Sequence, residues 1–268
     1  MKGKILRFLS LAVSGLILLY ILLPILILIA NSFNSSRFFE FPPTGFSLKW
    51  YQRFFQNKEY QNSLFVSIRI ASIAALVGVL VGVPAAYAIK RYKFKGSNFL
   101  QAVFLSPLMI PSIVWALGLI QFLSMVRIGK MTLLGSLPGL ILAHTVIILP
   151  YVIRMVITSL SYMDEDLEAA AQSLGAKPVR TFFEITLPLI SPGIIMSAVF
   201  GFMVSFTDVV VTSFIGGAKF VTYPVRMYSE IRTEGLDPLA VAVSSVVVIS
   251  IVIISLICEK TMQWSRFI

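Results

Sequence analysis

The amino-acid sequence predicts an all-α, polytopic membrane protein with six transmembrane helices. Of its 268 residues, 57% are apolar and only 13% are charged, a balance that soluble domains do not show. The apolar residues form runs that match the roughly 20 residues with which a helix crosses about 30 Å of hydrocarbon. Side chains within these runs are continuously apolar, whereas a transmembrane barrel would need alternating ones. Helices are therefore the predicted spanning elements.

Six runs reach the required length and predict a single transmembrane domain over residues 1–268. Their approximate limits are 9–31, 62–89, 98–125, 134–160, 189–215 and 238–258. The first run follows a basic N-terminal segment, as the apolar part of a signal peptide would. It is longer than that part usually is, and no small-residue cleavage site follows it. We therefore interpret it as a transmembrane helix.

Basic residues in the short flanks of the spans predict the orientation in the membrane. They precede the first span and fill the link between the second and the third: Lys2, Lys4, Arg7, Lys90, Arg91, Lys93 and Lys95. The positive-inside rule places both flanks in the cytoplasm, and an even number of spans then places both termini there. The net charge of +10 indicates contact with anionic membrane lipid rather than with nucleic acid.

The segment 161–188, between the fourth and fifth spans, predicts a helix–turn–helix on the cytoplasmic surface. Asp164 is placed to cap a short helix that has an acidic first turn and is extended by three consecutive alanines. Gly175 is expected to end this helix in a left-handed turn, and Pro178 to open a second helix. The small side chains of the alanine face would let another protein approach closely.

Residues of this segment resemble the EAA loop of binding-protein-dependent ABC importer permeases. The matching positions, at fixed spacing, are Ala170, Ala171, Gly175, Ile185, Leu187 and Pro188. In that family the loop is the coupling helix, which docks on the cytoplasmic ATPase, so the resemblance assigns these residues to ATPase coupling. It also implies an all-α fold of the type I ABC importer permease class.

One position departs from the family pattern. Aligned on Gly175, the glutamate of the family's triplet is replaced by Ala169, and Glu168 stands one residue earlier. One residue turns a helix by about 100°, so the carboxylate leaves the family's position. We include Glu168 among the predicted coupling residues, on the hypothesis that it bonds a basic or backbone donor on the ATPase.

The resemblance extends over nearly the whole chain. Segments 205–214 and 223–228 are similar to the spermidine/putrescine permease branch of the family, whose relatives transport other organic cations, aminophosphonates, thiamine or iron. The implied substrate is a polyamine or similar organic cation, with an aminophosphonate, thiamine or iron as alternatives. The implied partners are a second homologous permease, two cytoplasmic ATP-binding subunits and an extracytoplasmic substrate-binding protein. The implied location is the bacterial inner membrane.

Sequence motifs for catalysis are absent. The chain contains no G-x-x-x-x-G-K-[ST], no H-E-x-x-H and no G-x-S-x-G, and it has a single histidine and a single cysteine. We therefore expect no enzymatic activity, no metal and no cofactor, with ATP bound by the partner subunits. The same absence argues against an intramembrane enzyme. A secondary transporter is the remaining rival, although it would ordinarily have more spans or an inverted repeat.

Polar residues inside the spans predict a translocation pathway. Ser205, Asp208 and Thr212 are spaced to form one polar stripe on the fifth span, which would line a wet passage or bind a neighbouring helix. In a passage, the Asp208 carboxylate would attract an ammonium group. His144 and Tyr151 of the fourth span belong to the same predicted pathway.

Two alternatives remain open for these residues. A lone histidine within a span also suits a hydrogen bond between two helices, which would make His144 structural. Asp208 could instead form an ion pair with Arg69, because both are roughly 10 Å inside the predicted outer boundary at about 1.5 Å per residue.

Overall fold

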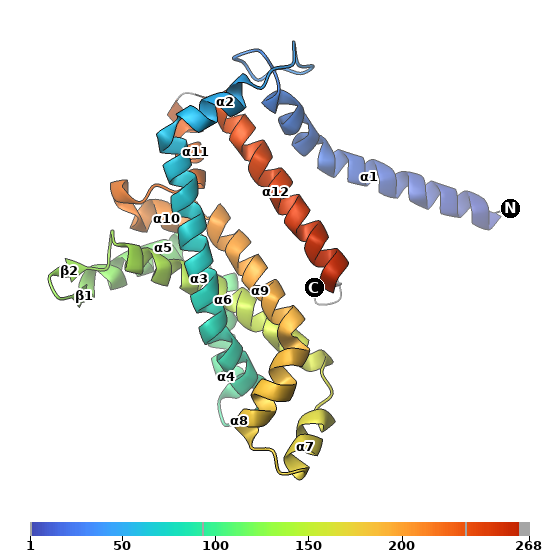
Figure 1. Ribbon diagram of the computed structural model, residues 1–268, viewed down its shortest axis with the longest axis vertical. Coiled ribbons are helices and arrows are strands. Elements are labelled where there is room, and N and C mark those ends of the chain that lie inside the picture. The colour runs from blue at the N-terminus through green and yellow to red at the C-terminus, as the bar shows by residue number, and fades with distance from the viewer. Residues whose placement is uncertain (1, 93, 234, 263–268) are drawn as a thin grey trace. The chain divides into compact units, whose positions relative to one another are not determined.

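The computed structural model describes residues 2–92, 94–233 and 235–262 (Figure 1). They form two compact units, one from Met1–Gln61 with Ser229–Ile254 and the other from Asn62–Tyr228 with Ser255–Ile268. The single transmembrane domain stays a prediction. Lys93 and the side chains of Lys2 and Lys4, on which the predicted orientation partly depends, lie outside what the structure describes.

The first unit contains α1 (Lys2–Ser32), α2 (Lys49–Gln56) and most of α12 (Pro238–Met262). No residue of the most apolar window of α1 is buried within the chain. A helix that is apolar on all sides and unburied must be covered by lipid or by another protein. The loop before α2 is held by Trp50, whose indole Nε1–H donates to the carbonyl of Asn34 over 2.8 Å.

The second unit is built from nine helices among the described residues, of which α3 begins and α11 ends in the first unit. They are α3 (Lys58–Arg91), α4 (Ser97–Leu105), α5 (Ser112–Met125), α6 (Leu137–Tyr162), α7 (Asp166–Ser173), α8 (Pro178–Thr181), α9 (Leu187–Thr207), α10 (Val210–Ile215) and α11 (Tyr223–Thr233).

Helices α3, α6 and α9 pack closely because small residues stand where they meet. A β-carbon added at Gly82 of α3 would lie 2.7 Å from Cγ1 of Val152 on α6. On the α9 side, Gly201 faces both Val152 and Ile148 of α6. Lipid tails are as apolar as the side chains, so membrane helices associate through such close packing rather than through a hydrophobic driving force.

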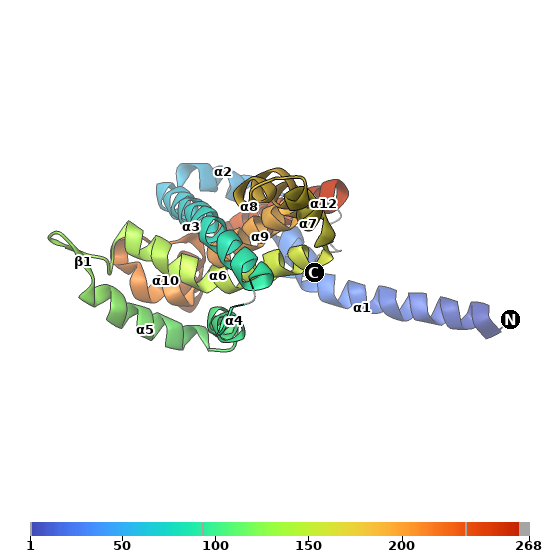
Figure 2. The same ribbon diagram turned by 90° about the horizontal axis from the view of Figure 1, so that it is seen from below.

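The predicted span over 98–125 is not one continuous helix. Helix α4 is followed by a 3-10 turn at Ser106–Leu108, and α5 then runs in a direction that differs by 106° (Figure 2). Pro111 explains the break, because its backbone is extended (φ −55°, ψ 137°) and the residue has no amide hydrogen to donate. The pair is a bent span or a re-entrant segment.

The predicted fifth span is also interrupted. Helix α9 ends at Thr207, Asp208 is extended (φ −67°, ψ 128°), and α10 begins at Val210. The Asp208 carboxylate explains the restart, because it accepts the amide hydrogen of Thr212 over 2.8 Å and so satisfies a free donor of the new helix. The polar stripe expected on one helix is therefore divided between two.

The all-α membrane fold is confirmed. Five helices are long and apolar enough to span a membrane, and the bent α4–α5 pair makes a sixth if it is counted as one span, among the residues that the structure describes. The five are Leu9–Ser32, Lys58–Arg91, Leu137–Tyr162, Pro178–Thr207 and Pro238–Ile257. One small addition is a hairpin of β1 (Arg127–Ile128) and β2 (Met131–Thr132), whose turn uses Gly129 at φ +64°.

Candidate functional site

The segment 161–188 folds as the predicted helix–turn–helix, here called the elbow. The Asp164 carboxylate accepts the amide hydrogen of Asp166 over 3.0 Å, where α7 begins. At the end of α7, the amide of Gly175 bonds the carbonyl of Gln172, and the next amide bonds the carbonyl of Ala171. These two bonds form a Schellman motif, which requires the left-handed conformation that Gly175 adopts at φ +91°.

Part of the exposed surface of the elbow is apolar, beside exposed polar residues such as Gln172 and Ser173. Ala169 and Ala170 are exposed, and Leu174 is 90% exposed. Exposed apolar surface of this kind marks an interaction site when it is contiguous. Leu174 was not among the residues predicted from the sequence, although its place directly before the turn glycine was a usable signal.

The remaining predicted coupling residues lie where the elbow joins α9. Ile185 belongs to a π-helical turn, Phe182–Thr186, and Leu187 and Pro188 open α9 itself. Pro188 has no amide hydrogen to donate to the carbonyl four residues earlier, which accounts for the wider turn at this point. These residues shape the start of α9 and are not part of the α7 face.

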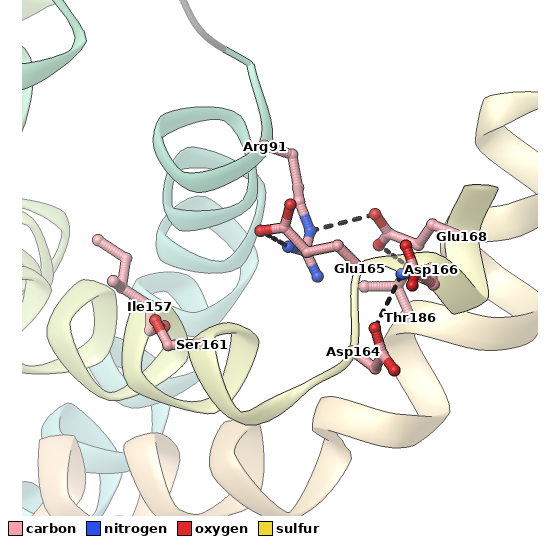
Figure 3. Close-up of polar contacts among 8 residues, drawn as sticks. All are labelled: Arg91, Ile157, Ser161, Asp164, Glu165, Asp166, Glu168 and Thr186. Carbon is pink, nitrogen blue, oxygen red and sulfur yellow. Dashed lines mark hydrogen bonds and ion pairs between the residues drawn. The ribbon is translucent and has the colours of Figure 1, made fainter.

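The Glu168 carboxylate points into the chain (Figure 3). Its side chain is 11% exposed and lies between Arg91, at the end of α3, and Thr186. Arg91 Nε is 3.1 Å from Oε2, an ion pair without hydrogen-bond alignment, and the Thr186 hydroxyl donates to Oε1. The hypothesis that this carboxylate reaches the ATPase is therefore not supported by its contacts. Arg91 and Thr186 were not foreseen as its partners.

Arg91 holds a second carboxylate as well. Its Nη1 lies 2.6 Å from Oε1 of Glu165, whose side chain is 72% exposed, whereas the Arg91 side chain is only 8% exposed. The guanidinium thus joins a buried and an exposed glutamate at the start of α7. No sequence signal connected these residues, because Arg91 and Glu165 are 74 positions apart.

His144 links the two halves of the polar stripe. Its Nδ1 is 2.7 Å from the Ser205 hydroxyl, and its Nε2 is 3.0 Å from the Thr212 hydroxyl. Because Thr212 donates its hydroxyl hydrogen to Asp208 over 3.0 Å, it accepts from Nε2–H, and Nδ1 then accepts from Ser205. This network ties α6 to α9 and α10, which is the interhelical arrangement that the sequence left open for His144.

Two of the predicted pathway residues line a cavity. Asp208 and Tyr151 border a space of about 100 Å³, together with Trp115, Ser112 and Pro107 from the α4–α5 region. The indole Nε1 of Trp115 is buried and has no hydrogen-bond partner among the described residues. His144, Ser205 and Thr212 are buried and do not line this space. The predicted set thus divides into cavity residues and helix-linking residues.

Arg69 does not pair with Asp208. The Arg69 residue is exposed, and within the described part of the chain no ion pair joins it to the Asp208 carboxylate. That carboxylate is instead used at the start of α10. The other carboxylate oxygen of Asp208, Oδ2, accepts a long hydrogen bond of 3.5 Å from the Val211 amide.

Comparison with known proteins gives consistent matches. Residues 78–259 match the family described as "Binding-protein-dependent transport system inner membrane component". The chain is 34% identical to the spermidine/putrescine transport system permease protein PotC of Haemophilus influenzae, covering 86% of this chain and 87% of the relative. It is 33% identical to the putrescine transport system permease protein PotI of Escherichia coli K12, covering 80% and 76%.

A solved structure has the same fold. A chain from the crystal structure of a bacterial ABC transporter that imports the acidic polysaccharide alginate superimposes with a TM-score of 0.74. The superposition covers 97% of this chain and 98% of the other, at 15% sequence identity.

Proposed function

The chain belongs to the family of binding-protein-dependent transport system inner membrane components, and from this premise we propose that it imports a polyamine or similar small organic cation. It is a multi-pass inner-membrane permease, and it would form half of the translocation pathway of an ATP-driven importer. The observation that carries the choice of substrate is the cavity beside Asp208, taken with the names of the relatives.

The cavity has the chemistry that an ammonium group needs. The Asp208 carboxylate supplies a negative charge, and its Oδ2 accepts only a long hydrogen bond among the described residues. Trp115 and Tyr151 supply aromatic rings. A cation is attracted to the face of an aromatic ring and to a carboxylate in the same site. Asp208 would therefore be a way-station for the cation, while the network around His144 keeps α6, α9 and α10 in position.

Two of the proposed partners would bind exposed surfaces of the chain. The elbow face with Ala169, Ala170 and Leu174 would dock on a cytoplasmic ATPase, one of two that bind and hydrolyse ATP. The unburied α1 would contact lipid and a second, homologous permease. An extracytoplasmic binding protein would deliver the substrate. The chain itself would catalyse no reaction and hold no cofactor, and both termini would face the cytoplasm.

Reconstitution of the complete complex tests this proposal. Proteoliposomes that contain both permeases and the ATPases, supplied with the binding protein, should accumulate radiolabelled putrescine or spermidine only when ATP is present inside. A complex with an inactive ATPase is the control. Uptake without ATP would contradict an ATP-driven importer. Uptake that is blocked by thiamine, an aminophosphonate or ferric iron, but not by excess polyamine, would contradict the substrate class.

A further inference from the structure

Three segments that are distant in the sequence meet at one buried carboxylate. Glu168 of α7 contacts Arg91, the last residue of α3, and Thr186, the last residue of the π turn before α9 (Figure 3). We infer that this network is a direct link through which movement of α7 reaches α3 and the start of α9. Arg91, Glu168 and Thr186 are then positioning residues for transport. The inference rests on the proposed function, because it assumes that the elbow docks on an ATPase.

The two faces of α7 have different contacts. Glu168 is buried against the spans, whereas Ala169 and Ala170, turned by about 100° and 200° around the same helix, are exposed. A short helix moves largely as one body, so a displacement of its exposed face also displaces the opposite face. The partner would therefore press on the alanine face, and Glu168 would transfer the displacement to the spans.

The network is suited to transmit force because the Arg91 guanidinium and the Glu168 carboxylate are both largely buried and form an ion pair. A buried carboxylate is stable only when it is paired and hydrogen-bonded, and Glu168 has both an ion pair and a hydroxyl donor. The planar guanidinium of Arg91 engages Glu165 and Glu168 with different nitrogens, which a single ammonium group could not do with the same geometry. At the C-terminal end of α3, the positive charge also suits the helix dipole.

The departure from the family pattern agrees with this arrangement. A glutamate at position 169 would lie on the exposed face, whereas Glu168 lies on the buried one. In this chain the Glu168 carboxylate thus makes contacts within the chain, and the small side chain of Ala169 occupies the exposed face of α7. Ala169→Glu should accordingly leave the internal link intact.

The test compares uptake with ATP consumption in the same reconstituted complexes, using putrescine as the probe. Thr186→Val keeps the side-chain volume and removes the hydroxyl, and Glu168→Gln keeps the shape and removes the charge. Both variants should retain the ATPases and hydrolyse ATP, while the putrescine imported per ATP falls by about three- to tenfold. Arg180→Gln, which breaks the exposed Arg180–Glu184 pair of the same elbow, is the matched control and should keep the wild-type ratio.

A doubly neutral variant, Arg91→Gln with Glu168→Gln, separates transmission from simple stability. It removes both buried charges and leaves neither one unpaired, so assembly and ATP hydrolysis should stay near wild type while the ratio of putrescine to ATP stays low. A wild-type ratio in this variant, or in both single variants, would overturn the inference. Failure of the wild-type complex to import putrescine would instead contradict the proposed function, so the two failures are distinguishable.

Discussion

Gly193 of α9 lies so close to Ser159 of α6 that a β-carbon at Gly193 would be 2.5 Å from both Cβ and Oγ of the serine. Cβ atoms do not approach other atoms to this distance, so the helices would have to separate. Ser159 is buried, and α6 and α9 have the most extensive contact of any two helices among the described residues. The close contact between α6 and α9 therefore requires glycine, which has no side chain, at position 193.

Gly193→Ala should destabilise the permease by about 1–3 kcal/mol, because overpacking forces two helices apart. The measurement is thermal unfolding of the purified complex in detergent, monitored as the loss of its monodisperse peak in size-exclusion chromatography. Gly118→Ala in α5 is the matched control, since nothing lies within 4 Å of the added carbon there. Equal stability of the two variants would mean that the close contact does not hold α6 and α9 together.

Gly175→Leu should reduce coupling between ATP hydrolysis and transport. A β-carbon at Gly175 would meet no atom within 4 Å, so the cost comes only from the backbone at φ +91°, which side chains disfavour. The Schellman motif would then be distorted and the elbow misdirected, without an effect on membrane insertion. Uptake and ATPase retention are the measurements. Asparagine tolerates the left-handed conformation better than leucine does, so Gly175→Asn should be closer to wild type. Equal loss of coupling in the Leu and Asn variants would exclude the backbone as the cause.

Leu174→Ala should weaken attachment of the ATPases by about tenfold, because an exposed apolar side chain at the centre of a docking face contributes roughly 1–2 kcal/mol. The dissociation constant between detergent-solubilised permease and purified ATPase measures this. Leu80→Ala on α3 is the control, since Leu80 is also well exposed, at 65%, but lies within a membrane span. Unchanged affinity in Leu174→Ala would remove this residue from the docking face.

Asp208→Asn should lower putrescine uptake strongly while assembly and basal ATP hydrolysis stay near wild type. The amide oxygen still accepts the Thr212 amide hydrogen, so the start of α10 is kept and only the charge in the cavity is lost. Uptake by assembled complexes is the measurement.

Asp208→Ala is the second variant, and it should also cost about 0.5–2 kcal/mol of stability, because it removes the acceptor that begins α10. Adding Arg69→Gln to Asp208→Asn should rescue nothing, since the two side chains are not paired in this structure. Wild-type uptake by Asp208→Asn would refute the way-station.

The sequence by itself determined the features that depend on local physical chemistry. Continuous apolar runs predicted membrane helices, since the hydrocarbon core admits little else. Asp164, Gly175 and Pro178 predicted the start, the turn and the second helix of the elbow, because capping and left-handed turns depend on a few neighbouring residues.

Only the tertiary structure decided which side chains meet across long sequence distances. The prolines near residues 107–111 were visible in the sequence, but the 106° change of direction between α4 and α5 was not. The face of α7 on which Glu168 lies could be worked out from the helix period, yet its partner Arg91 belongs to another helix. Asp208 was expected to lie within a continuous helix, and instead it ends α9 and caps α10. A sequence pattern reports propensity and burial, whereas the partner of a buried charge is set by how the helices are arranged in space.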